Sequence, residues 1–187
     1  MALELKRRRF TVEEYDRMAQ AGILGEDDRV ELISGEVLEM TPIGRRHASC
    51  VARLVHLFDQ ALGGSAVIWP QNPVHLSEHS EPQPDLAVLH ARADFYAAGH
   101  PVPEDVFLLV EVAESSTDPD RRVKVPLYAA GGIPEVWLID LEQETVTVYR
   151  HPAPDGYRTA RVFRRTEQVS PAAFPHRSFD VDDILPG

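Results

Sequence analysis

The sequence has a single cysteine, Cys50, among its 187 residues. One cysteine cannot form an intrachain disulfide, and a zinc finger needs paired cysteines, so both are excluded. Cys50 lies on an apolar helical pattern, which favours a structural role; a thiol nucleophile assisted by His47 or His56 is the alternative. No run of about 18 apolar residues is present, and the basic start lacks the apolar segment of a secretory signal. We therefore expect a cytoplasmic protein that does not cross a membrane.

Positive charge is also scarce, since 19 lysines and arginines face 30 aspartates and glutamates, for a net charge of −11. This balance counts against broad, nonspecific binding of nucleic acid, which depends on a cationic surface. Basic stretches at 45–46, 121–124 and 161–165 form either a local groove or solvated faces with counter-charges. The length suits one domain with a substantial core. We expect a flexible N-terminus over residues 1–9 and a single domain over 10–187.

Local patterns predict helices alternating with strands. Thr11 and Glu14 form a capping box that begins a short helix. The pair Ser34-Gly35 predicts a tight turn in a hairpin of strands 29–33 and 36–40. The other expected elements are a helix at 46–62 ended by Gly63-Gly64, strands at 66–70, 84–89, 106–113, 134–140 and 144–149, an extended piece at 73–76, a helix from about 119 to 130 with its cap at 115–119, and one or two strands after 157. This order predicts an α/β or α+β fold, a mixed sheet flanked by helices.

Two acidic residues stand on strands that should be buried. Asp85 belongs to the strand at 84–89, and Glu111 interrupts the apolar run at 106–113. A buried carboxylate is unfavourable unless it is paired or holds a metal ion. Placed side by side on neighbouring strands, the two would form a hard oxygen site suited to Mg²⁺ or Mn²⁺, with the backbone carbonyl of Val112 as a third ligand. The alternatives are a turn or strand-edge acid for Asp85 and a buried ion pair for Glu111.

Six segments in order carry a resemblance to a known family, over roughly residues 10–150. They are Phe10–Tyr15, Val30–Glu36, Pro82–Leu86, Val110–Ser116, Lys124–Ala129 and Gly132–Asp140. Together they resemble the Uma-two family of restriction-endonuclease-like proteins, and Pro84-Asp85 with Glu111-Val112-Ala113 resembles the PD-(D/E)XK nuclease signature. The resemblance implies the restriction-endonuclease-like fold, with a central mixed sheet and helices on both faces. It also implies Mg²⁺-dependent hydrolysis of DNA with Asp85 and Glu111 as metal ligands.

The sequence departs from the signature at Ala113, where a lysine is expected. The resemblance implies that Lys124, from the following helix, takes over and orients water or phosphate, since a long side chain on a neighbouring helix can reach the same point. The alternative is an exposed lysine paired with Asp120. The resemblance also implies a role for Glu31 as an extra ligand of metal or water; the alternative is a strand residue on the solvent face.

Three further side chains are weaker candidates. Gln83 lies two residues before Asp85, on the same face of the strand, and contacts either a phosphate or a structural partner. His47 begins the long helix and either reaches a phosphate or stays partly exposed. Tyr128 shares the helical face of Lys124, where packing is a sufficient role. Glu114, Asp118 and Asp120 are interpreted as capping or solvated acids.

The leading hypothesis is a Mg²⁺-dependent endonuclease that hydrolyses DNA phosphodiester bonds. A second hypothesis is a catalytically inactive binding or assembly module on a nuclease scaffold, favoured by the acidic charge and by Ala113. A third is a hydrolase of a small phosphoester. Homodimers are common among proteins of this fold, so a homodimer is also expected.

Overall fold

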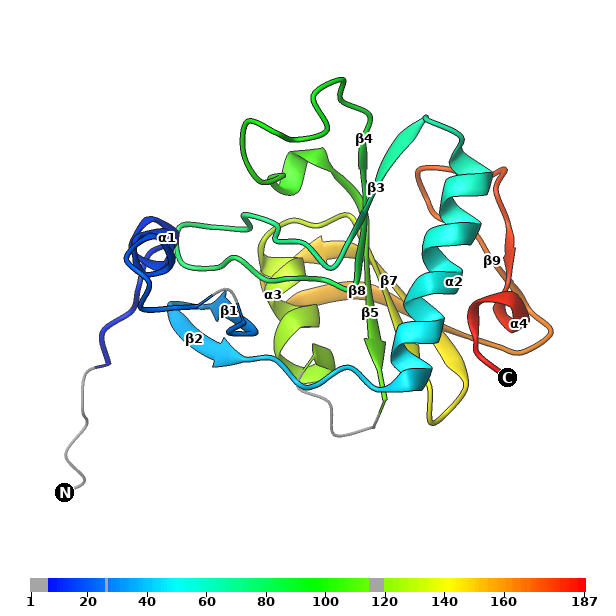
Figure 1. Ribbon diagram of the computed structural model, residues 1–187. Helices are drawn as coiled ribbons and strands as arrows, with labels where there is room; N and C mark the ends of the chain where they lie inside the picture. The colour runs from blue at the N-terminus through cyan, green and yellow to red at the C-terminus, as the bar shows by residue number, and fades with distance from the viewer. Residues whose placement is uncertain (1–6, 26, 115–119) are drawn as a thin grey trace.

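A six-stranded mixed sheet forms the centre of the computed structural model, which describes residues 7–25, 27–114 and 120–187 (Figure 1). The strand order is β3-β4-β5-β6-β7-β8, and every neighbouring pair is antiparallel except β5-β6, which is parallel. The bounds are β3 Ala66–Pro70, β4 Leu86–His90, β5 Val106–Ala113, β6 Glu135–Asp140, β7 Thr145–Ala153 and β8 Gly156–Arg164. The predicted mixed sheet is confirmed.

The strand β5 is central, and seven of its eight residues are buried. It lies between β4 and β6. Helices cover both faces of the sheet there, which explains why the sequence of β5 is apolar nearly throughout instead of alternating. Glu111 is the exception in this apolar run, and it lies near the carboxyl end of the strand.

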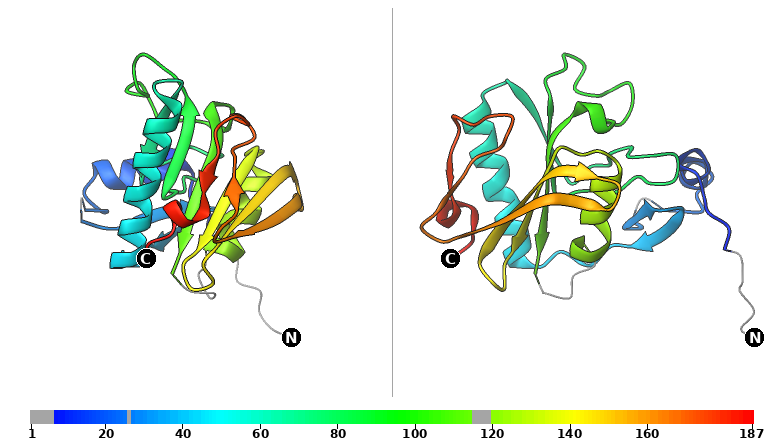
Figure 2. Two further views of the ribbon diagram at one scale, coloured as in Figure 1. Left: turned by 90° about the vertical axis from the view of Figure 1, so that its right-hand side faces the viewer. Right: turned by 180° about the vertical axis from the view of Figure 1, so that it is seen from behind.

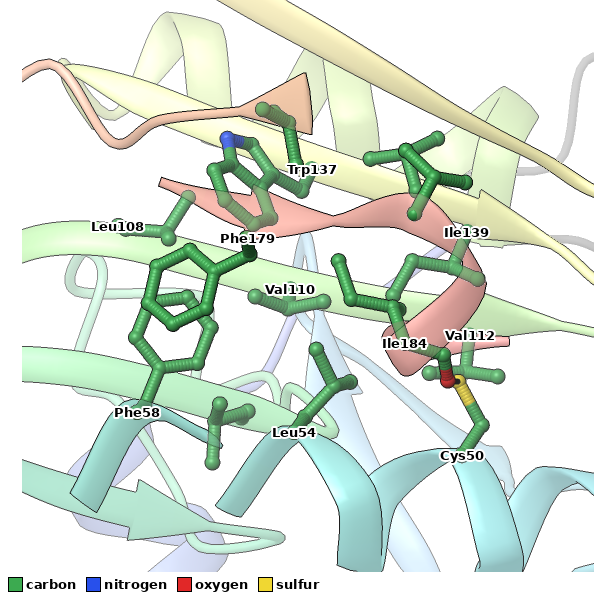
Figure 3. Close-up of a cluster of buried hydrophobic side chains, with 14 of the residues drawn as sticks. Cys50, Leu54, Phe58, Leu108, Val110, Val112, Trp137, Ile139, Phe179 and Ile184 are labelled. Atoms are coloured by element: carbon green, nitrogen blue, oxygen red, sulfur yellow. Dashed lines mark hydrogen bonds between the residues drawn. The ribbon is translucent and has the colours of Figure 1, made fainter. Parts of the chain in front are cut away.

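The helix α2, Arg45–Leu62, covers one face of the sheet. Its buried residues recur at helical spacing, and Leu54 and Phe58 point into the core shown in Figure 3. The helix ends at Gly63, whose φ of 48° is in the left-handed region that glycine adopts readily. This element is confirmed almost to the residue.

The helix α3, Val125–Ala130, lies on the opposite face of the sheet from α2 (Figures 1 and 2). It follows directly on a π-helical turn, η2 Asp120–Lys124. The helix expected from about 119 to 130 is present over the described residues 120–130, with a change from π to α winding at Lys124. The predicted cap at 115–119 lies outside the described residues. Wider π turns inside helices often accompany functional sites, because they re-aim a side chain.

The helix α1, Val12–Gln20, and the hairpin of β1, Val30–Ile33, and β2, Glu36–Glu39, form a separate unit beside the main sheet (Figure 1). The predicted capping box of α1 is present. The hairpin turns at Ser34 and Gly35, which have φ values of 51° and 81°, as a tight two-residue hairpin turn requires.

The segment at 73–76, predicted as an extended piece, forms no strand. Its backbone instead closes a loop, since Val74 N donates to Pro82 O at 3.0 Å and Leu76 N donates to Ser80 O at 3.0 Å. The far side of this loop holds the hairpin, because Glu81 N donates to Leu32 O at 2.8 Å. The sequence pattern could not show the pairing of Glu81 with Leu32, because the loop carries no regular pattern and its partner on β1 is distant in the sequence.

The C-terminal segment packs beside α2 on the same face of the sheet and completes the core there (Figure 2). It contains the short strands β9 Gln168–Val169 and β10 Phe179–Asp180 and the helix α4 Val181–Ile184, and a 3₁₀ turn, η1 Pro103–Asp105, precedes β5. The rings of Phe58 and Phe179 lie 4.7 Å apart between centroids. Cys50 is fully buried here, and burial raises the pKa of its thiol to about 12. The predicted structural role of Cys50 is confirmed, because such a thiol stays protonated.

Candidate active site

A pocket of about 320 Å³ opens where β4 begins and β5 ends. The hairpin and the segment that joins it to α2 form its outer wall, while the sheet and the start of α3 form its floor. All of the residues singled out from the sequence as catalytic, metal-binding or substrate-contacting line this pocket: Glu31, His47, Gln83, Asp85, Glu111, Val112 and Lys124.

Asp85 and Glu111 come together through the register of β4 and β5. Leu86 is paired with Val110, so the same antiparallel register continued by one residue sets Asp85 opposite Glu111. Opposite residues on antiparallel strands share a face of the sheet. Beyond the last ladder pair, the Asp85 carboxylate continues the contact between the strands, because its Oδ2 accepts a hydrogen bond from Val112 N at 2.8 Å.

The other Asp85 oxygen, Oδ1, lies 3.0 Å from Nε2 of His47, in the first turn of α2. Asp85 is thus held from β5 on one side and from α2 on the other, and its side chain is 13% exposed. His47 is partly exposed in the first turn of the helix, as expected, and it also contacts Asp85 directly. Two fixed partners hold the aspartate in one orientation at the pocket wall.

Lys124 joins two acids at the floor of the pocket. Its Nζ lies 3.1 Å from Glu31 Oε2 and 3.5 Å from Glu111 Oε1, and it donates to the carbonyl of Gln83 at 3.4 Å. The lysine is 4% exposed. The alternative of an exposed surface lysine is therefore wrong. The side chain leaves the junction of η2 and α3, which places its stem under the pocket.

Glu31 is also buried, at 7% exposed, so the alternative of a solvent-facing strand residue is wrong. Its Oε2 accepts from the backbone N of Gln83 at 3.1 Å, in addition to the contact with Lys124. The Gln83 side chain donates to Val30 O at 3.4 Å. This is the structural hydrogen bond considered for Gln83. It fastens β1 to the segment just before β4, which also carries Asp85.

Tyr128 is a site residue whose role sequence reasoning underestimated. It is fully buried, and its hydroxyl donates to Glu111 Oε1. Tyr128 stands four residues after Lys124, and side chains four apart lie on the same face of a helix. That spacing predicted the shared direction, but it could not identify Glu111 as the partner, because Glu111 is on another element.

Glu114 caps the long helix. Its Oε1 accepts from the backbone N of His47 at 3.3 Å, while the N-cap residue Gly44 provides no side-chain bond of its own. A Cβ atom at Gly44 would collide with the Glu114 carboxylate, so glycine permits this close approach. The interpretation of Glu114 as a capping acid is confirmed, with α2 as the helix that it caps.

The described part of the pocket lining is acidic, with five carboxylates, from Glu31, Glu39, Asp85, Glu111 and Glu114, and two cations, from Arg29 and Lys124. Such a lining attracts cations and repels a bare phosphate.

Hard divalent ions bind oxygen ligands, and the pocket wall carries several. Asp85 and Glu111 offer carboxylate oxygens, and the Val112 carbonyl leaves β5 on the same side as the N–H that bonds Asp85. Within the described residues, no three side chains of His, Cys, Asp or Glu form a group that could hold a metal ion. An ion there would need backbone oxygen and water to complete its coordination, which is how Mg²⁺ is commonly bound.

Comparison with known proteins identifies a family and a similar solved structure. The model of the Uma2 family, described as "Putative restriction endonuclease", matches residues 12–182. The fold is similar to the crystal structure of "a putative nuclease belonging to DUF820" from Anabaena variabilis ATCC 29413, with a TM-score of 0.73 and 18% identity over 94% of this chain and 97% of that chain. No curated protein matches the sequence. Among the described residues, no helix has the length and apolar character needed to span a bilayer.

Proposed function

The chain belongs to the Uma2 family of restriction-endonuclease-like proteins, and from that premise we propose that it is a metal-dependent endonuclease that hydrolyses DNA phosphodiester bonds. The observation that carries the proposal is the buried Lys124 held between Glu31 and Glu111, in the pocket that Asp85 also lines. A buried lysine and several acids at the end of two strands form a polar cluster that the core does not need for packing.

The proposed ligands of the divalent ion, Mg²⁺ or Mn²⁺, are Asp85, Glu111 and the Val112 carbonyl. When bound, the ion would supply positive charge to the phosphate and a more acidic water molecule. The chain's own contribution is to hold these oxygens in place. His47 and Val112 N fix Asp85, and Tyr128 fixes Glu111.

Lys124 is proposed to orient the attacking water or a phosphate oxygen, and Glu31 to keep its ammonium group in position. A flexible lysine side chain loses its freedom when two carboxylates hold its Nζ from different strands, so its charge is aimed before substrate arrives. Ala113 stands where the nuclease signature has its lysine, and it is buried. The helix thus supplies the cation that the strand does not.

The direct test is nicking of supercoiled plasmid by purified protein in Mg²⁺ or Mn²⁺. The expected result is cleavage by the wild-type protein that Asp85→Asn abolishes. Asp155→Asn is the matched control, because Asp155 is exposed and outside the pocket. Cleavage that persists unchanged in Asp85→Asn would overturn the proposal.

A second candidate function is an inactive nuclease scaffold that binds a partner. The acid-rich lining favours it, because two carboxylates already occupy Lys124. Calorimetry with Mn²⁺ separates the two functions. The nuclease proposal expects binding in the millimolar range or tighter, with loss of binding in Asp85→Asn and Glu111→Gln. Absence of Mn²⁺ binding alongside retained DNA or protein binding would favour the inactive scaffold.

A further inference from the structure

The outer wall of the pocket carries four apolar side chains, interspersed with Glu39 and Thr41, whereas its floor is acidic. Leu38, Met40, Pro42 and Ile43 follow one another along β2 and the segment that leads to α2, and all four line the pocket. Leu38 and Ile43 are 37% and 41% exposed, among the few large apolar side chains on the described surface. Exposed apolar groups beside a polar cluster commonly contact a ligand.

The cations of the lining are too few for recognition of duplex DNA. Among the described residues that line the pocket, Lys124 is held by two acids, and Arg29 donates to the carbonyl of Thr41 at 3.3 Å. Duplex binding gains most of its affinity from many cation–phosphate contacts that release counterions. A chain with a net charge of −11 has little of that attraction to offer.

The size of the pocket is a second argument against recognition of duplex DNA. A volume of about 320 Å³ is near the lower end for small-molecule sites, and it accommodates a unit of nucleotide size. A base within a duplex is stacked and paired, so its flat face cannot reach an apolar wall. The face of a base becomes accessible only when the strand is unpaired or the nucleotide is turned out of the helix.

We propose that the substrate of this site is unpaired DNA, with the face of one base against the wall formed by Leu38, Met40, Pro42 and Ile43. This inference rests on the proposed nuclease function and deepens it. The phosphate next to that base lies at Asp85 and Glu111, and the apolar contact supplies the affinity that the scarce cations do not. Apolar and stacking contacts with bases are tolerant of sequence.

The test measures, by fluorescence anisotropy, the binding of a labelled 12-nucleotide strand and of the corresponding duplex to the wild-type protein in Ca²⁺, a divalent ion that offsets the repulsion between the acidic lining and the phosphate. We expect the single strand to bind at least about tenfold more tightly, with a slope of log K against log salt of roughly −1 to −2, since about 0.7 counterion is released per neutralised phosphate. Duplex bound as tightly as single strand, or no binding of either, overturns the inference.

Substitutions of Leu38 and Ile43 test whether the base contacts the proposed wall. Leu38→Ser with Ile43→Ser should weaken binding of the single strand about tenfold, whereas Leu38→Met with Ile43→Leu should retain it. Val162→Ser is the control, because Val162 is 44% exposed but lies on β8, outside the pocket lining. Equal loss in the control, or no loss in the double serine variant, contradicts the assigned wall. Tight single-strand binding without cleavage in Mg²⁺ or Mn²⁺ would end the nuclease proposal and leave this inference standing.

Discussion

Two buried glutamates lie on the two parallel strands at the centre of the sheet, and their surroundings differ. Glu111 on β5 and Glu135 on β6 are each 1% exposed. Glu135 accepts from Trp137 Nε1 at 2.6 Å, from Arg150 at 2.9 Å and from the backbone N of Ala172 at 2.6 Å. Glu111 instead accepts from Tyr128 and lies beside Lys124, at the wall of the pocket.

The comparison shows that burial of a carboxylate does not by itself mark a functional site. Either glutamate would be unfavourable without partners. Glu135 lies away from the pocket, at the amino end of β6. Its partners fasten β7 and the segment at 170–172 to that end of the strand. The partners of Glu111 come from η2 and α3, which also form the floor of the pocket. The location of the partners, more than the depth of burial, separates the two roles.

The largest expected effect is on cleavage by Glu111→Gln. Loss of one ligand charge should lower the rate by about 10³-fold or more, since the metal contributes several kcal/mol to the transition state. Glu135→Gln should cleave at close to the wild-type rate per folded molecule. Plasmid nicking, normalised to the folded fraction from circular dichroism, measures both. Equal losses in the two variants would erase the distinction between the two glutamates.

The free energy of unfolding provides a second comparison, in which the substitution at Glu135 has a large effect. Glu135→Ala leaves Arg150, the Trp137 indole and the Ala172 amide without their acceptor. We expect a loss of about 3 kcal/mol in the free energy of unfolding, the lower part of the range for a broken buried pair, because the Arg150 side chain is 36% exposed. Urea denaturation measures this loss. A change below about 1 kcal/mol would mean that water replaces the lost acceptor.

Two buried or partly buried tyrosines, Tyr128 and Tyr157, allow the same kind of comparison. Tyr128→Phe removes the donor to Glu111, whereas Tyr157→Phe removes a donor to the backbone carbonyl of Ile133 at 2.8 Å. Tyr128 is proposed as a positioning residue, so its loss should lower Mn²⁺ affinity or cleavage about 10-fold, as for partners of metal ligands. Both variants should lose a similar amount of stability, about 1 kcal/mol. Calorimetry with Mn²⁺ therefore separates them, and equal Mn²⁺ affinity would leave Tyr128 a structural residue.

The sequence predicted the parts that depend on local chemistry. The turn at Ser34-Gly35, the end of α2 at Gly63 and the apolar run of β5 each follow from neighbours within a few residues. The convergence of Asp85 and Glu111 followed because both strands were recognisable. The direction of Lys124 came from the family resemblance alone, since nothing local shows where a lysine on the next helix points.

The parts that could not be predicted depend on distant partners. Glu135 bonds to residues 15 and 37 positions away, and Tyr128 to one 17 positions away. No periodicity encodes such contacts. The pairing of the extended piece at 73–76 with residues 80–82 could not be predicted for the same reason, because these backbone bonds close on the loop itself and on β1.

Glu81 is another buried carboxylate, and its partners are weaker than those of Glu111 and Glu135. It is 4% exposed, and its Oε2 lies 3.7 Å from Nδ1 of His75. Burial raises its pKa from 4.5 to about 7, Asp16 adds to the rise, and His75 opposes it. The folded protein therefore keeps this proton at pH values where the unfolded chain has lost it.

The sign of the pH dependence follows from that difference. The stabilisation by the bound proton is complete below about pH 4.5 and is lost as the pH rises towards 7, by at most about 1.4 kcal/mol per pH unit. Glu81→Gln keeps a neutral side chain and should flatten this part of the profile, whereas the exposed Glu78→Gln on the same loop should not. Urea denaturation at pH 5, 6, 7 and 8 measures the profile. A decline that is as steep in Glu81→Gln as in the wild-type protein would assign the proton to another group, and Glu81 would then be as well compensated as Glu135.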